Sequence, residues 1–267
     1  MAQRIVHFLL HVPKCAGTTV EAHFRQHLGD AFRFAPRWEN PLRNFVGNRY
    51  PGLNPEALEG IRAVSGHSLS ISLKAHFPGV EIRQSVLLRD PVGYLLSFYN
   101  YRWARFDEGW GSEPPSFEAW YRGQRRNPIS RFLLNRYFEE AVPALYRLSS
   151  AARLRLLEAH LAGFHFVGSY RYADEMIGGI SRELGIPDHV DHQNVTPRRK
   201  LSAADLTDEM RRRIEADNAL DQALFDRWAE RRWDGVPEGP APKLPGADQG
   251  RYLLGDTVSG VLKKFIA

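Results

Sequence analysis

A short apolar run near the amino terminus leads directly into a turn of small residues, and this junction constrains the fold most strongly. The run covers residues 5–10, and the turn reads HVPKCAGTT over residues 11–19. Continuous apolar runs of this length are typical of strands buried on both faces, and the apolar spacing over residues 18–28 is typical of a helix. The sequence therefore predicts a strand over residues 4–12 that opens an α/β unit.

Later segments repeat the order of strand followed by helix, with strands predicted over residues 61–65, 85–88 and 164–169. This order favours a mostly parallel sheet with helices on both faces, an α/β fold in three layers. Residues 30–60 are predicted to form loop and short helix. Helices are predicted over residues 92–106, 116–122, 128–138, 142–161, 173–184 and 203–232.

The chain has 267 residues, enough for one large domain or two small ones. We interpret residues 1–234 as one folded domain. Residues 235–267 are rich in Pro and Gly at their start, so we interpret them as a C-terminal extension with a short helix over residues 251–267.

Composition narrows the partners and the location. There are 36 Lys and Arg residues against 31 Asp and Glu, a net charge of +5, so an anionic partner is plausible. We find no basic helix, RNA-binding signature or finger spacing, and expect no nucleic-acid binding. Cys15 is the one cysteine, which excludes an intrachain disulfide and fits a reducing compartment. The first apolar run is too short to span a membrane, so we expect a cytoplasmic protein.

The turn after the first strand is predicted to bind an anion. A strand that turns into a helix directs backbone amides and the positive end of the helix dipole at one point. Ala16 and Gly17 leave that point open, Thr18 and Thr19 add hydroxyl donors, and Lys14 adds a full charge. The alternative is an ordinary connection capped by Thr18. Lys14 precedes the glycine, so this is no Walker A motif, and no clear acidic strand end is available for Mg²⁺.

A second anion site is predicted at the end of the strand over residues 85–88. Arg89 follows the strand at the edge where parallel sheets bind ligands, and Ser97 lies two turns into the next helix. Asp90 before Pro91 is typical of a helix cap. Taken alone, this turn could simply be capped and carry a surface arginine. Together with the Lys14 turn, it indicates a ligand with two separated phosphates.

Both turns resemble motifs of the PAPS-dependent sulfotransferases, especially the carbohydrate group that includes the heparan sulfate 2-O and 6-O enzymes. The family's first motif, His-x-Pro-Lys-x-x-Gly-Thr-Thr, matches residues 11–19, and its second, Arg-Asp-Pro-x-x-x-x-x-Ser-x-Tyr, matches residues 89–99. Gly66-His67 resembles its catalytic Gly-His, and residues 194–196 resemble its Asn-x-[Ser/Thr] loop. The family often has arginine at the position of Tyr94 and an acid at that of Arg171.

The resemblance implies a P-loop-like fold, with residues 1–234 as a sulfotransferase domain that transfers a sulfuryl group from PAPS to a hydroxyl, releasing PAP without a metal. The acceptor would be a carbohydrate or glycan. It makes His67 the base and Lys14 the group that neutralises the leaving phosphate. The implied cofactor-binding residues are Lys14, Cys15, Ala16, Gly17, Thr18, Thr19, Arg89, Ser97, Thr196, Arg198 and Arg199.

Several alternatives stay open at this point. The basic segment 198–200 could close over the cofactor, meet an anionic glycan, or be simply solvated. Trp103, Trp110 and Trp120 could stack on sugar rings or belong to the core. The whole chain could instead be a kinase-like nucleotide enzyme with an unusual phosphate loop, or a catalytically silent nucleotide- or glycan-binding module.

Overall fold

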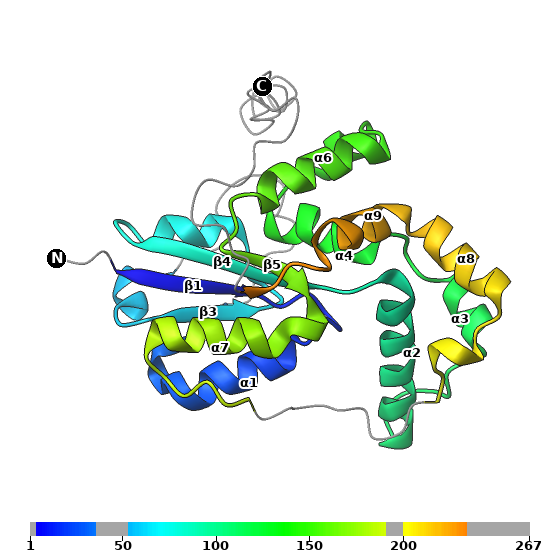
Figure 1. The fold of residues 1–267 in the computed structure, drawn as a ribbon, viewed down its shortest axis with the longest axis horizontal. Coiled ribbons are helices and arrows are strands. Elements are labelled where there is room, and N and C mark those ends of the chain that lie inside the picture. Colours follow the sequence, from blue (N-terminus) through cyan, green and yellow to red (C-terminus); the bar gives the residue numbers. More distant parts are fainter. Residues whose placement is uncertain (1–3, 36–52, 191–199, 234–267) are drawn as a thin grey trace.

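The computed structural model describes residues 4–35, 53–190 and 200–233, and its centre is one parallel sheet (Figure 1). The strand order is β2-β3-β1-β4-β5, and every adjacent pair is parallel. The strands are β1 (Ile5–Leu10), β2 (Phe32–Phe34), β3 (Ala63–Gly66), β4 (Glu81–Leu88) and β5 (Phe166–Ser169).

Helices cover both faces of this sheet, which confirms the predicted three-layer α/β fold. In Figure 1, α1 and α7 lie along one face, α4, α6 and α9 lie toward the other, and α2 projects from the end of β4 toward α3 and α8. The α-helices are α1 (Gly17–Leu28), α2 (Pro91–Asp107), α3 (Phe117–Arg122), α4 (Pro128–Arg131), α5 (Val142–Tyr146), α6 (Ser150–Leu161), α7 (Ala173–Leu184), α8 (Asp208–Asp217) and α9 (Ala219–Trp228).

The central strand explains the strength of the first sequence signal. β1 pairs with β3 on one side and β4 on the other, and Val6 and Phe8 are fully buried. His7 is also buried, with Nε2 3.5 Å from a Glu183 carboxylate oxygen. Burial lowers the pKa of His7 to about 4, so this strand is uncharged at neutral pH along its buried length.

Four sequence predictions were wrong in detail. β2 lies within the segment predicted as loop and helix, because three residues are too few for a periodic signal. The helix predicted over residues 142–161 is divided into α5 and α6, and a π-helix (Phe132–Tyr137) follows α4. The helix predicted over residues 203–232 is broken into α8 and α9. The predicted terminal helix and C-terminal extension lie outside the described residues.

The break between α8 and α9 occurs at Asn218, whose side chain competes with the helical backbone. Its Nδ2 donates to the Ile214 carbonyl and its Oδ1 accepts from the Asn127 amide, both at 2.8 Å. Such side-chain bonds offer the backbone an alternative to continuing the helix. In the described ranges, none of the helices is long and apolar enough to cross a membrane.

Two side chains then cap α4 and α9 reciprocally. Asn127 Oδ1 accepts from the amides of Leu220 and Asp221 at 3.0 and 3.1 Å, while the Asp221 carboxylate accepts from Ile129 and Ser130 at 2.9 and 2.7 Å. Asp221 is 2% exposed, and burial raises its pKa to about 6. This pair of caps fixes α4 against α9.

Asp221→Ala is expected to lower the free energy of unfolding by about 2 kcal/mol at pH 7, because two buried amides lose their acceptor. An unfolded aspartate titrates near 3.9, so the native wild type binds a proton between pH 6 and pH 4 that the unfolded chain does not. The difference in free energy of unfolding between wild type and variant should therefore grow as the pH falls through this window, by up to about 1.4 kcal/mol per pH unit. Urea unfolding at pH 7, 6 and 5 measures it. The exposed Asp226→Ala on the same helix is the control, and a deficit that shrinks toward pH 5 would contradict this account.

Candidate functional site

A cleft of about 1060 Å³ opens at the carboxyl edge of the sheet. The ends of four strands supply its floor, because parallel strands all end at the same edge: Lys14 follows β1, His67 follows β3, Arg89 follows β4 and Tyr170 follows β5. β1 and β4 are neighbours, but the chain continues from β1 to β2 at one edge of the sheet and from β4 to β5 at the other edge. The cleft therefore lies at the switch point where open α/β sheets bind ligands.

The turn between β1 and α1 is held in an unusual backbone conformation. Lys14 and Ala16 have φ angles of 63° and 65°, and α1 begins at Gly17. Ala16 occupies the N-cap position without a side chain that could accept a hydrogen bond, so the first amides of α1 lack a side-chain cap. A Cβ at Gly17 would overlap the His11 ring. The turn is thus shaped to leave helix amides available to a ligand.

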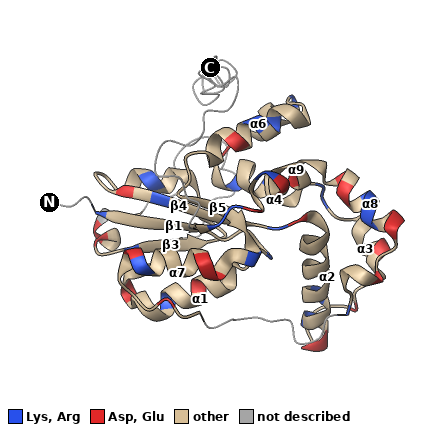
Figure 2. Ribbon diagram, in the orientation of Figure 1, with Lys and Arg blue, Asp and Glu red and all other residues tan. Residues whose placement is uncertain are grey.

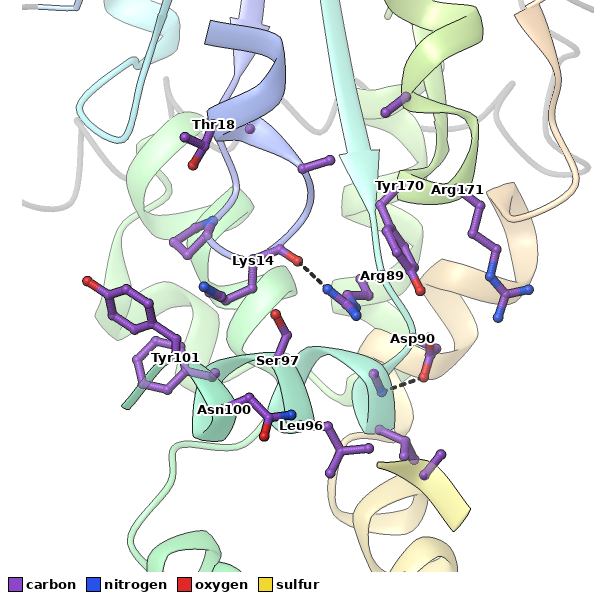
Figure 3. A pocket seen from close by; sticks show the side chains of 18 of the residues that line it. Lys14, Thr18, Arg89, Asp90, Leu96, Ser97, Asn100, Tyr101, Tyr170 and Arg171 are labelled. Carbon is purple, nitrogen blue, oxygen red and sulfur yellow. Dashed lines mark hydrogen bonds between the residues drawn. The ribbon is translucent and has the colours of Figure 1, made fainter. Parts of the chain in front are cut away.

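Arg89 connects this turn to the end of β4 (Figure 3). Its Nη1 donates to the main-chain carbonyl of Lys14 at 3.0 Å, and its guanidinium lies over the Tyr170 ring with 4.2 Å from Cζ to the ring centroid. Arg89 Nε is buried and has no protein partner among the described residues. Asp90 accepts from the Gly93 amide at 2.6 Å, which confirms the predicted cap of α2.

The two cations are held near each other without carboxylate partners. Lys14 Nζ lies 4.2 Å from the centroid of the Tyr101 ring, and within the described part of the chain neither Lys14 nor Arg89 forms an ion pair. Burial and the charge of Arg89 lower the pKa of Lys14. Negative charge bound beside either cation would offset this repulsion.

His67 reaches the cleft from the end of β3 with a defined tautomer. Its Nδ1 lies 2.9 Å from the His11 carbonyl oxygen, which can only accept, so Nδ1 carries the proton and Nε2 is unprotonated in the neutral ring. Burial first, and His11 second, lower the pKa of His67, so the ring is neutral at pH 7. A neutral imidazole with an unprotonated Nε2 is suited to accept a proton.

A buried cluster of polar side chains next to His67 connects the ends of β1 and β3 to α1. The His11 ring stands 3.9 Å from the His67 ring, centroid to centroid, and His11 Nδ1 lies 2.8 Å from Glu21 Oε1. Ser65 Oγ donates to the same Glu21 oxygen at 3.0 Å. Glu21, on α1, thereby joins the end of β1 to the end of β3 and is engaged away from the cleft.

Most of the residues predicted from the sequence meet in this cleft. Its lining includes Lys14, Ala16, Gly17, Thr18, Thr19, His67, Arg89 and Ser97. Cys15 differs, because its side chain is 2% exposed and packs into the core, which leaves only its backbone near the turn. Thr196, Arg198 and Arg199 lie outside the described residues. Trp120 is buried in the core, so it is unavailable for sugar stacking, whereas Trp110 is 61% exposed.

Sequence reasoning missed a further set of cleft residues. Arg171 and Arg211 add positive charge, and Asp174 and Glu215 add negative charge. Asn100, on α2, donates to the Leu201 carbonyl and accepts from the amides of Lys200 and Leu201 at 2.8 to 3.0 Å. It thereby fixes the backbone at Lys200 and Leu201, where the basic segment ends. No local motif marks these residues.

The wider surface carries charges of both signs. Figure 2 shows acidic and basic residues interspersed along α7 and α8. Across the described residues, no group of three or more His, Cys, Asp or Glu side chains is placed to hold a metal ion.

Comparison with protein-family models, curated proteins and solved structures finds no match for this chain.

Gly17→Ala is expected to lower the free energy of unfolding by about 1–3 kcal/mol, because the added methyl group overlaps His11, which is itself packed against Glu21 and His67. Urea unfolding monitored by far-UV circular dichroism measures the change. Gly163→Ala is the matched control, since a Cβ there would meet only one backbone oxygen at 3.9 Å. Equal stability of the two variants would contradict the described packing of the turn.

Proposed function

We propose that this chain is a PAPS-dependent sulfotransferase that transfers a sulfuryl group to an acceptor hydroxyl, with a carbohydrate as the acceptor class. The observation that carries the proposal is the convergence of two anion-binding positions, at Lys14 and Arg89, and one neutral histidine, His67, in a single cleft. A donor with phosphates at two ends needs two such positions. A hydroxyl acceptor needs a base beside them.

The residues present fit the donor by their chemistry. The uncapped amides at the start of α1 and the Lys14 ammonium suit the phosphosulfate end. The Arg89 guanidinium, whose Nε has no partner among the described residues, and Ser97 on α2 suit the 3′-phosphate end. The resemblance noted in the sequence assigns the same two turns to the same two ends.

In the reaction proposed, the sulfur–oxygen bond to the phosphate breaks and a sulfur–oxygen bond to the acceptor forms. Lys14 and the α1 amides stabilise the negative charge that develops on the leaving phosphate. His67 Nε2 accepts the acceptor's hydroxyl proton, while the His11 carbonyl, hydrogen-bonded to Nδ1, holds the ring in the required tautomer.

PAP, the product of this reaction, is expected to raise the melting temperature, because a ligand that binds only the native state stabilises it by mass action. At about 100 times Kd the gain is about 2.7 kcal/mol, which corresponds to roughly 5–10 °C for a domain of this size. Lys14→Ala should weaken the effect strongly. Arg102→Ala, an exposed residue of α2 outside the cleft lining, should leave it unchanged. A larger shift with ATP and Mg²⁺ than with PAP would instead favour a kinase-like enzyme.

His67→Ala is expected to lower kcat by about 10²–10⁴-fold while leaving the PAP-induced melting shift within about 1 °C of wild type, because a general base acts on the acceptor and not on donor binding. Transfer of ³⁵S from labelled PAPS to a panel of sugars measures turnover. His27→Ala, at the last turn of α1 and outside the cleft lining, is the control. A variant that binds PAP normally and keeps full turnover would remove His67 from the mechanism without affecting donor assignment.

A further inference from the structure

A second, smaller cavity of about 140 Å³ lies among α4, the π-helix that follows it, α5, α6 and α9. Three arginines line it, Arg126, Arg131 and Arg153, and among its described lining residues none is acidic. Leu220 of α9 lines this cavity, whereas Gln222 lines the large cleft. Residues two apart on a helix point in nearly opposite directions, so α9 separates the two spaces.

The three guanidinium groups are only partly satisfied by protein. Arg126 Nη2 lies 2.9 Å from Asp217 Oδ2, but Arg126 Nη1 is buried without a partner among the described residues. Arg153 Nε donates to the Leu145 carbonyl at 2.9 Å. In the part of the chain that the structure describes, the Arg131 side chain forms neither an ion pair nor a hydrogen bond. Arg126 Nη1 and the Arg131 guanidinium are therefore donors of lining residues that have no partner among the described residues.

Hydrogen bonds hold the frame around this cavity and occupy the buried carboxylate of Asp221. Asn127, with a φ of 50°, is locked by its bonds to α9 and to Asn218. The Asp221 carboxylate is not part of the lining and accepts two amides of α4. Asp217 compensates the charge of Arg126, whereas Arg131 and Arg153 form no ion pair among the described residues, and an anion placed between these two would balance their charge.

We propose that this cavity binds a tetrahedral oxyanion, as free sulfate or phosphate or as the corresponding group of a small molecule. Guanidinium forks match the paired oxygens of such groups. The space is several times the volume of one water molecule, which is about 30 Å³, and so admits the whole anion. The inference is independent of the sulfotransferase assignment, since it rests on different residues on the other side of α9.

The experiment is calorimetric titration of the full chain with sulfate and, separately, phosphate, at constant ionic strength set with chloride. The Lys14→Gln background weakens binding in the large cleft, and the cavity variants made in that background show how much of the remaining saturable binding belongs to the second cavity. In that background, Arg131→Gln together with Arg153→Gln is expected to weaken the remaining affinity by about tenfold or more. Arg155→Gln, an exposed neighbour on α6 that does not line the cavity, should stay within about twofold.

The titrations distinguish a specific anion site in this cavity from its absence. Preference for one of the two anions identifies the group, and a loss confined to the cavity variants supports the site. No saturable binding in the Lys14→Gln background, or full binding by the cavity variants, overturns it. Should the double variant fail to fold by circular dichroism, Arg131→Gln alone decides the question, because the Arg131 side chain forms no hydrogen bond or ion pair with the described residues and its loss leaves the hydrogen bonds of the frame in place.

Discussion

The hydrogen bond from the Arg89 guanidinium to the main-chain carbonyl of Lys14 holds the candidate site together. It joins the residue that follows β4 to the turn that follows β1, two strands already paired side by side. The turn itself is unfavourable, since Lys14 and Ala16 both have positive φ angles that non-glycine residues seldom adopt. A fixed donor on the Lys14 carbonyl stabilises this conformation. The same bond brings two positive charges into one cleft, and burial together with the charge of Arg89 lowers the pKa of Lys14.

The central part of this arrangement could be predicted because its signals are local. An apolar run, a turn of small residues and an amphipathic segment together specify strand, turn and helix, and a parallel sheet brings all strand ends to one edge. Lys14, His67 and Arg89 each directly follow a strand or lie within a few residues of its end, so their convergence follows from the order of elements alone. The Asp90 cap was equally predictable, because Asp before Pro satisfies the first amides of a helix.

The rest could not be predicted, because it depends on contacts between residues far apart in the chain. Tyr170 is visible as a cleft residue only once β5 is placed beside β4, and Asn100 only once residues 200–201 are placed against α2. The break at Asn218 results from its bond to Asn127, 91 residues earlier. Cys15 shows the opposite failure: its position within the turn suggested contact with a ligand, but the positive φ angles on either side direct its side chain to the core.

The way in which the cations are held bears directly on what the cleft can do. A carboxylate partner would neutralise Lys14 or Arg89, and an incoming anion would have to displace it. Aromatic rings act differently: the faces of Tyr101 and Tyr170 attract the cations by about 0.5–2 kcal/mol and restrict their motion, yet leave the charge uncompensated. Both cations are therefore positioned before a ligand arrives, so binding gains their full charge without the cost of breaking an ion pair or ordering a long side chain. This arrangement favours a doubly anionic ligand over a neutral one of the same shape, because only the former relieves the repulsion between the two cations.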